Sequence, residues 1–138
     1  MLPRLALSVR QPWAHAILHG GKAVENRSWP THFRGTIGLH AARSMEPKDI
    51  EAFFRFLEER GLAGSWLTRS AVETLPRGAV VGLVDIVDCV KVSTSPWFEG
   101  PYGFVLANPR AINPIPCRGA QKLFDLPAEL RFPLAQCG

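Results

Sequence analysis

The sequence predicts an α+β protein in which one sheet curls toward a barrel and helices flank it. Apolar segments of strand length outnumber helical patterns, and the connections between them are too varied for a regular βαβ series. The 138 residues are enough for one domain with a substantial core. With 46% hydrophobic and 20% charged residues, the composition is typical of a globular chain. We therefore expect residues 1–138 to form a single domain.

The first expected unit is a strand, a short helix and a second strand. Residues 5–9 alternate larger and smaller side chains, which indicates a strand. Pro12 suits the first turn of a helix, where its missing N–H costs nothing, and Gly20-Gly21 should end that helix. Residues 22–29 can form the second strand, which Trp29-Pro30-Thr31 should break.

A third strand and a longer helix should follow. The strand is expected over 36–42, after a turn at Arg34-Gly35. Ser44 or Glu46 would cap the helix, Pro47 would lie in its first turn, and Gly61 would stop it. The inward stripe of this helix would be formed by Ile50, Phe53, Phe54 and Leu57.

The second half of the chain alternates irregular and strand-like segments. The pattern favours, in order, a short helix over 68–75, a long apolar strand over 79–92 and a further strand over 102–108. Asn108-Pro109-Arg110 is expected to end the last of these strands. Residues 114–116 should stay extended and lead into a polar turn over 118–122.

Charge and cysteine usage narrow the class of protein. The formal net charge of +4 permits an anionic partner such as nucleic acid without requiring one. Cys89, Cys117 and Cys137 form no metal-binding pattern and suggest free thiols in a reducing compartment, with Cys89 in the core and Cys137 exposed. No apolar run reaches the roughly 20 residues that span a bilayer. We therefore expect a cytoplasmic protein without membrane contact, metal or cofactor.

The junction between the first strand and the first helix is one candidate binding site. Arg10 and Gln11 precede a helix start, which attracts anions, and the guanidinium of Arg10 suits a phosphate or carboxylate. In the alternative interpretation, Arg10 only pairs with an acid such as Glu25.

The charged run Lys22, Glu25 and Arg27 is a second candidate. On a strand, Glu25 and Arg27 share a face and can form an ion pair. Lys22 and Glu25 could transfer a proton if burial brought their pKa values toward neutrality. The alternative, which the spacing alone favours, is a solvated strand with alternating charges.

Aromatic and histidine side chains flank this run. Trp13 and Trp29 could stack on a nucleobase, although core packing is the commoner fate of tryptophan. His15 and His19 have the i, i+4 spacing of metal ligands but lack an obvious third ligand, so a solvent-facing or hydrogen-bonding role is expected.

The segment LSVRQPWAHAILHGGKAVENRSWPTHFRG resembles the opening of an ASCH domain, part of the PUA-like superfamily. The G-x-K-x-x-E-x-R signature of that family stands here as Gly20, Lys22, Glu25 and Arg27. The later segments RGAVVGLVDIVDC and ANPRAINPIPCRGAQKLFDLP are also similar, so the resemblance covers nearly the whole chain. It implies a PUA-like mixed β-barrel of five or six strands with flanking helices, and a cleft lined by the first helix start and the signature strand.

The resemblance also implies a function. ASCH domains were proposed to bind RNA, which predicts a single-stranded RNA or nucleotide ligand and no cofactor. The residues expected to contact that ligand are Arg10, Gln11, Trp13, Arg27, Trp29 and Lys122, and Lys22 is expected to meet phosphate together with Arg10 and Arg27. In the enzyme alternative, Lys122 or Arg118 from the C-terminal turn would close the site.

Small ASCH proteins that resemble this one also include enzymes: one group hydrolyses the amide of N4-acetylcytidine, and others cut single-stranded RNA. For this chain, such a hydrolase is expected to be metal-independent, because the sequence shows no cluster of metal ligands. By that resemblance Lys22 and Glu25 would be catalytic. Lys22 matches the lysine of the amidohydrolases, whereas Glu25 stands where those enzymes have a threonine, and Ser8 is the nearby hydroxyl. A protein-interaction role, as for ASCH domains attached to coactivators, ranks last.

Overall fold

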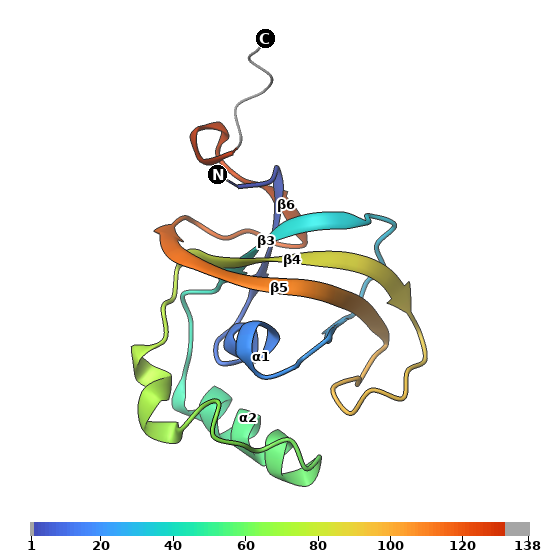
Figure 1. The fold of residues 1–138 in the computed structure, drawn as a ribbon, viewed down its shortest axis with the longest axis vertical. Coiled ribbons are helices and arrows are strands. Elements are labelled where there is room, and N and C mark those ends of the chain that lie inside the picture. The colour runs from blue at the N-terminus through green and yellow to red at the C-terminus, as the bar shows by residue number, and fades with distance from the viewer. Residues whose placement is uncertain (1, 132–138) are drawn as a thin grey trace.

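The structure, a computed structural model, describes residues 2–131 and is built on one six-stranded sheet (Figure 1). The predicted exposed Cys137 lies outside the described residues. The strands are β1 (Leu5–Val9), β2 (Val24–Arg27), β3 (Gly35–Ala41), β4 (Ala79–Val90), β5 (Tyr102–Pro116) and β6 (Leu123–Asp125). The helices are α1 (Trp13–His19), α2 (Pro47–Glu59) and the 3₁₀ turns η1 (Arg69–Thr74) and η2 (Ala128–Leu130).

The strands follow the order β2-β5-β4-β3-β1-β6 across the sheet. β1 and β3 are parallel, and all other neighbours are antiparallel. The sheet curls around α1, whose buried Ala14 and Ile17 belong to the same apolar cluster as side chains of β1, β3, β4 and β5. Figure 1 shows α1 against one face of the sheet and α2 beyond it. The α+β class and the barrel-like sheet are confirmed.

The curl brings opposite ends of the sheet together. β2 is an edge strand, whereas β1 is the second strand from the other edge. Arg27 of β2 nevertheless donates from Nη2 to the backbone oxygen of Ser8 in β1, at 2.8 Å. The Arg27 guanidinium therefore links β2 to β1 across the gap between the two ends of the curled sheet. We call this gap the seam.

α2 forms where the sequence predicts it. The side chain of Glu46 caps the first turn, and Asp49 accepts a hydrogen bond from the Glu46 N–H at 2.8 Å, which makes a reciprocal capping box. Phe53 and Leu57 are fully buried. They pack in a second apolar cluster that includes Trp97, from the loop before β5. Gly61, with a φ of +68°, lies just past the helix.

The end predicted for the fifth strand at Asn108-Pro109-Arg110 is wrong, because β5 continues through this tripeptide to Pro116. The register of β4 against β5 shifts here: Arg110 faces Leu83, whereas Ala107 faces Asp85. β5 therefore carries one extra residue, and a β-bulge tolerates a proline that cannot donate to the ladder. Asn108 adopts a φ of +52° in this bulge.

The expected core position of Cys89 is also wrong, because its side chain is only half-buried near the end of β4. Cys89 packs against the edge of the main apolar cluster instead of lying inside it. The strand predicted over 79–92 ends at Val90, so Cys89 lies where the sheet meets solvent.

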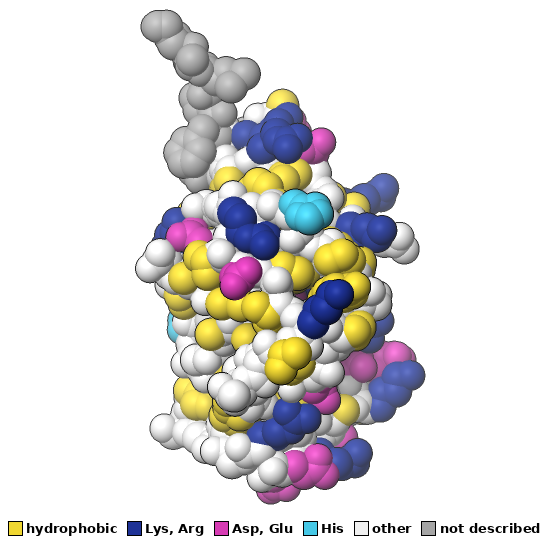
Figure 2. All heavy atoms as spheres, turned by 90° about the vertical axis from the view of Figure 1, so that its right-hand side faces the viewer, with side chains coloured by type: hydrophobic (Ala, Val, Ile, Leu, Met, Phe, Trp, Pro, Cys, Tyr) yellow, Lys and Arg dark blue, Asp and Glu magenta, His cyan; other side chains and the backbone are white. Residues whose placement is uncertain are grey.

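The described surface carries dispersed charge. Figure 2 shows Lys and Arg side chains spread over one face, with Asp, Glu and apolar side chains between them. Within residues 2–131, no helix combines the length and the apolar character that a bilayer crossing requires.

Candidate functional site

A cleft of about 630 Å³ opens where β1, β2 and the turn before β6 meet. We call it the Trp29 cleft. Six of the eight side chains predicted to form the site line it: Arg10, Trp13, Glu25, Arg27, Trp29 and Lys122. Residues more than ninety positions apart in the sequence are therefore brought to one hollow by the curl of the sheet.

Three charged side chains form a compact cluster at the wall of this cleft. Glu25 is 7% exposed, and its Oε1 accepts a hydrogen bond from Lys22 Nζ at 2.7 Å. Its Oε2 accepts from Arg27 Nε at 3.0 Å. The expected ion pair of Glu25 and Arg27 is confirmed, whereas a solvated strand of alternating charges is wrong for Glu25 and Lys22, which are both buried.

The two cations decide the charge state of Glu25. Burial by itself raises the pKa of a carboxyl group, but the charges and hydrogen bonds of Lys22 and Arg27 outweigh it. The net pKa of Glu25 lies below its ordinary value. Glu25 is thus an ionised carboxylate at neutral pH, suited to accept a hydrogen bond from a ligand and unable to act as a general acid.

Comparison with known proteins bears on this arrangement. A sequence model of the ASCH domain matches residues 7–116. The chain belongs to the ASCH domain family. It is 28% identical over 137 residues to activating signal cointegrator 1 of Homo sapiens and 26% identical over 137 residues to the Mus musculus protein of that name. Each alignment covers 90% of this chain but 22% of the relative, so the chain spans less than a quarter of these proteins.

In this ASCH domain, Lys22 lies behind the cleft wall. Its side chain is 3% exposed, and Nζ donates to Glu25 and to the backbone oxygen of Val24, at 2.6 Å. The lysine borders smaller hollows beside Trp13 and beside Ile17. The hydroxyl of Ser8 bonds instead to His40 Nδ1, at 2.9 Å. Lys22 therefore positions Glu25 from within the fold.

Gln11 has a structural place at the start of α1. Its side chain is 1% exposed, Nε2 donates to the backbone oxygen of Pro76 at 3.0 Å, and Oε1 accepts from the His15 N–H at 3.0 Å. All of these partners are backbone groups. We assign Gln11 to the fold of the helix start and not to the cleft wall.

Arg10 projects from the same junction toward solvent. It pairs with Asp49 of α2 at 3.3 Å, and its side chain is 56% exposed. The alternative in which Arg10 pairs with an acid is thus confirmed, with Asp49 as the partner in place of the suggested Glu25. Exposed pairs of this length contribute little to stability, so the guanidinium remains available to a ligand in the cleft.

The two tryptophans of the cleft differ in what surrounds them. Trp13 packs edge-on against Phe53 and Phe56, with ring centroids 4.8 and 5.1 Å apart, and so belongs largely to the core. Trp29 is half-buried and has one edge-to-face contact, with Phe104 at 5.0 Å. Lys122 Nζ lies 5.7 Å from the Trp29 ring centroid. Both rings are half-buried, and Trp29 has fewer aromatic neighbours than Trp13.

The histidine pair of α1 lies outside the Trp29 cleft. His15 Nε2 is 3.3 Å from the backbone oxygen of Trp66, and the His15 and His19 rings are 4.6 Å apart. Burial lowers the pKa of His15. Over residues 2–131, no three His, Cys, Asp or Glu side chains are grouped to hold a metal ion.

Sequence reasoning missed a second hollow that adjoins the cleft and contains His40 and Arg43. His40 faces Ser8 because β1 and β3 pair in parallel with these two residues in register. Neither His40 nor Arg43 stands in a local sequence motif. The β1–β3 pairing that brings His40 to Ser8 joins two strands that α1 and β2 separate in the chain.

Proposed function

We propose that the Trp29 cleft binds single-stranded RNA or a nucleotide, with a base stacked on Trp29 and phosphate held by basic side chains. The observation that carries this proposal is the half-buried Trp29 ring, which shares one cleft with the basic side chains of Arg10 and Lys122. Single-stranded nucleic acid is typically bound by such aromatic platforms beside positive charge.

The size and the polarity of the cleft support a nucleotide-sized ligand. Its volume of about 630 Å³ falls within the roughly 300–1,000 Å³ of small-molecule sites. A carboxylate can accept about four hydrogen bonds, and Lys22 and Arg27 do not fill this capacity on Glu25. Glu25 is therefore suited to accept a hydrogen bond from the amino group of a base.

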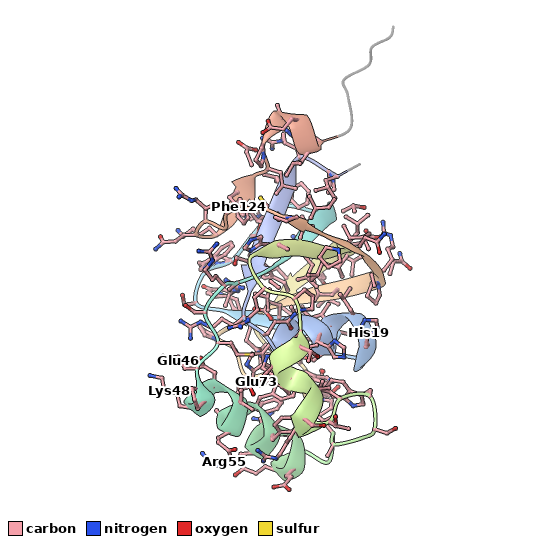
Figure 3. All side chains as sticks on the ribbon, turned by 90° about the vertical axis from the view of Figure 1, so that its left-hand side faces the viewer. His19, Glu46, Lys48, Arg55, Glu73 and Phe124 are labelled. Carbon is pink, nitrogen blue, oxygen red and sulfur yellow. The ribbon has the colours of Figure 1, made fainter. Side chains whose placement is uncertain are left out.

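Binding of a fluorescein-labelled single-stranded RNA, followed by fluorescence anisotropy, tests the proposal. Trp29→Ala should weaken binding by about 5- to 150-fold, because stacking of one base contributes roughly 1–3 kcal/mol. Trp29→Phe keeps an aromatic face and should recover part of the affinity. Arg55→Gln is the matched control, since Figure 3 shows Arg55 on α2.

Circular dichroism of each variant separates lost binding from lost folding, because Trp29 also contacts Phe104. An affinity that is equal in wild type, folded Trp29→Ala and Arg55→Gln would overturn the proposal. So would the absence of any RNA binding by the wild-type protein.

The alternative of a metal-independent hydrolase has less support from the geometry. Lys22 Nζ contacts a carboxylate and a backbone carbonyl, so it has no hydroxyl nucleophile to activate. Hydrolysis of single-stranded RNA or N4-acetylcytidine in EDTA, at a rate that folded Lys22→Met abolishes, would favour the hydrolase over a binding module.

A further inference from the structure

The second hollow, which we call the arginine lobe, has a volume of about 720 Å³ and adjoins the Trp29 cleft. Ser8, Arg10 and Ala42 line both hollows, so they form the shared wall. The arginine lobe is further lined by His40, Arg43, Arg118 and Gly119. The two hollows therefore adjoin each other at Arg10.

The lining of the arginine lobe is cationic. It contains Arg10, Arg43 and Arg118 and no acidic side chain among the described residues. Ion pairs in the described part of the chain involve Arg10, through Asp49, but neither Arg43 nor Arg118. Guanidinium groups without an internal carboxylate partner are suited to bind phosphate bidentately.

Buried contacts fix the segment that carries Arg118. His40 is 2% exposed, and its Nε2 donates to the backbone oxygen of Cys117 at 2.7 Å, since a carbonyl oxygen can only accept. The other nitrogen of the His40 ring, Nδ1, faces the Ser8 hydroxyl. A Cβ on Gly119 would fall 2.7 Å from the His40 ring, so this segment lies directly on the Ser8–His40 pair.

We propose that the arginine lobe is a second subsite for the same strand, binding the backbone phosphate next to the nucleotide whose base stacks on Trp29. This inference rests on the proposed function and adds a ligand class: an oligonucleotide of two or more residues, bound more tightly than a mononucleotide. A strand that leaves the Trp29 cleft past Arg10 enters the lobe between Arg43 and Arg118.

The salt dependence of binding counts the phosphate contacts. Affinity for a fluorescein-labelled octauridylate is measured between about 50 and 200 mM KCl, a range over which phosphate contacts dominate the salt effect. For single strands, the slope of log K against log [KCl] changes by about 0.7 per phosphate contact. Arg43→Gln and Arg118→Gln should each flatten the slope, and the double variant, which removes the contact to one phosphate, should flatten it by about 0.7 in total.

Two comparisons make the result specific to the lobe. Arg55→Gln removes the same charge from α2 and should leave the slope unchanged. Figure 3 shows Arg55 at the end of the molecule away from Phe124, whose ring lies 5.9 Å from the His40 ring. The dinucleotide pUpU, which carries two phosphates, should compete better than uridine 5′-monophosphate, which carries one, against wild type, and the double variant should lose most of that advantage.

The outcomes separate this inference from the proposed function. If Trp29→Ala weakens binding while the double variant keeps the wild-type affinity and slope, the lobe is not a phosphate subsite and the proposed function stands. If pUpU and uridine 5′-monophosphate compete equally with wild type, the second subsite is also excluded. If wild type binds no RNA, both proposals fail together.

Discussion

Removing the charge of Glu25 should destabilise this ASCH domain more than any other single change in the charged cluster. Lys22 Nζ lies 2.7 Å from Glu25 Oε1 and is 3% exposed. Two unit charges at that distance attract by about 6 kcal/mol at an effective dielectric constant of about 20. Desolvation offsets much of this, but Glu25→Gln leaves the buried ammonium without an anion, which typically costs 3–5 kcal/mol, on the order of a third of the stability of a domain.

Companion variants test whether the unpaired charge of Lys22 causes this loss of stability. Lys22→Met should cost less than Glu25→Gln, because Arg27 still neutralises the remaining carboxylate, 2.9 Å from Glu25 Oε2. The double variant Lys22→Met/Glu25→Gln should be more stable than Glu25→Gln alone by about 2 kcal/mol, since it removes the unpaired charge. Lys48→Met, on the surface of α2, should stay within about 0.5 kcal/mol of wild type (Figure 3).

Urea denaturation followed by far-UV circular dichroism, at neutral pH, measures each free energy of unfolding. A cost below about 1 kcal/mol for Glu25→Gln would refute the reasoning. So would a double variant no more stable than Glu25→Gln, because it would mean that Lys22 reaches water or another anion when Glu25 is neutral.

Three further predictions concern acid stability, the seam and the arginine lobe. Because the folded-state pKa of Glu25 lies below its ordinary 4.5, its contribution to the free energy of unfolding is present above that pH and is lost as the pH falls through the folded-state pKa. Urea titrations below about pH 4.5 should therefore show a steeper loss in wild type than in Glu25→Gln. Arg27→Lys cannot bond both Glu25 and the Ser8 carbonyl, so it should cost about 1–2 kcal/mol and speed amide hydrogen exchange in β2; unchanged exchange would contradict a bridging role. Gly119→Ala places a methyl group 2.7 Å from His40 Cε1 and should cost about 1–3 kcal/mol in urea denaturation, whereas an unaffected variant would show that the segment moves aside freely.

Local signals predicted those parts of the fold that depend on neighbouring residues. The alternation of residues 5–9, the cap at Glu46 and the glycine at Gly61 each act within a few positions, and the corresponding elements form where expected. The path of β5 through Pro109 was not predictable from the tripeptide, because the bulge that accommodates it depends on the register against β4. The parallel pairing of β1 with β3 is likewise a property of two distant segments.

The same distinction between local signals and contacts of distant segments applies to the candidate site. Alternation along β2 places Glu25 and Arg27 on one face, and their ion pair forms. The burial of Lys22 was not evident from the sequence, because Lys22 precedes β2 and its side chain reaches forward along the chain to Glu25. The roles of Gln11, His40 and Arg43 could not be read from the sequence, because each depends on a contact or a hollow formed by strands or loops far away in the chain.

The charge distribution separates the charged residues that stabilise the fold from those that we propose to bind RNA. In the signature, the charges of Lys22 and Arg27 are directed at Glu25 within the fold, so little of their field is left for a phosphate. Positive charge toward solvent comes instead from flanking side chains at the rims of the two hollows: Arg10, Arg43, Arg118 and Lys122. Variants of the signature should therefore act on stability first and on RNA affinity as a consequence. Variants of the rim should change the affinity and its salt dependence while the free energy of unfolding stays constant.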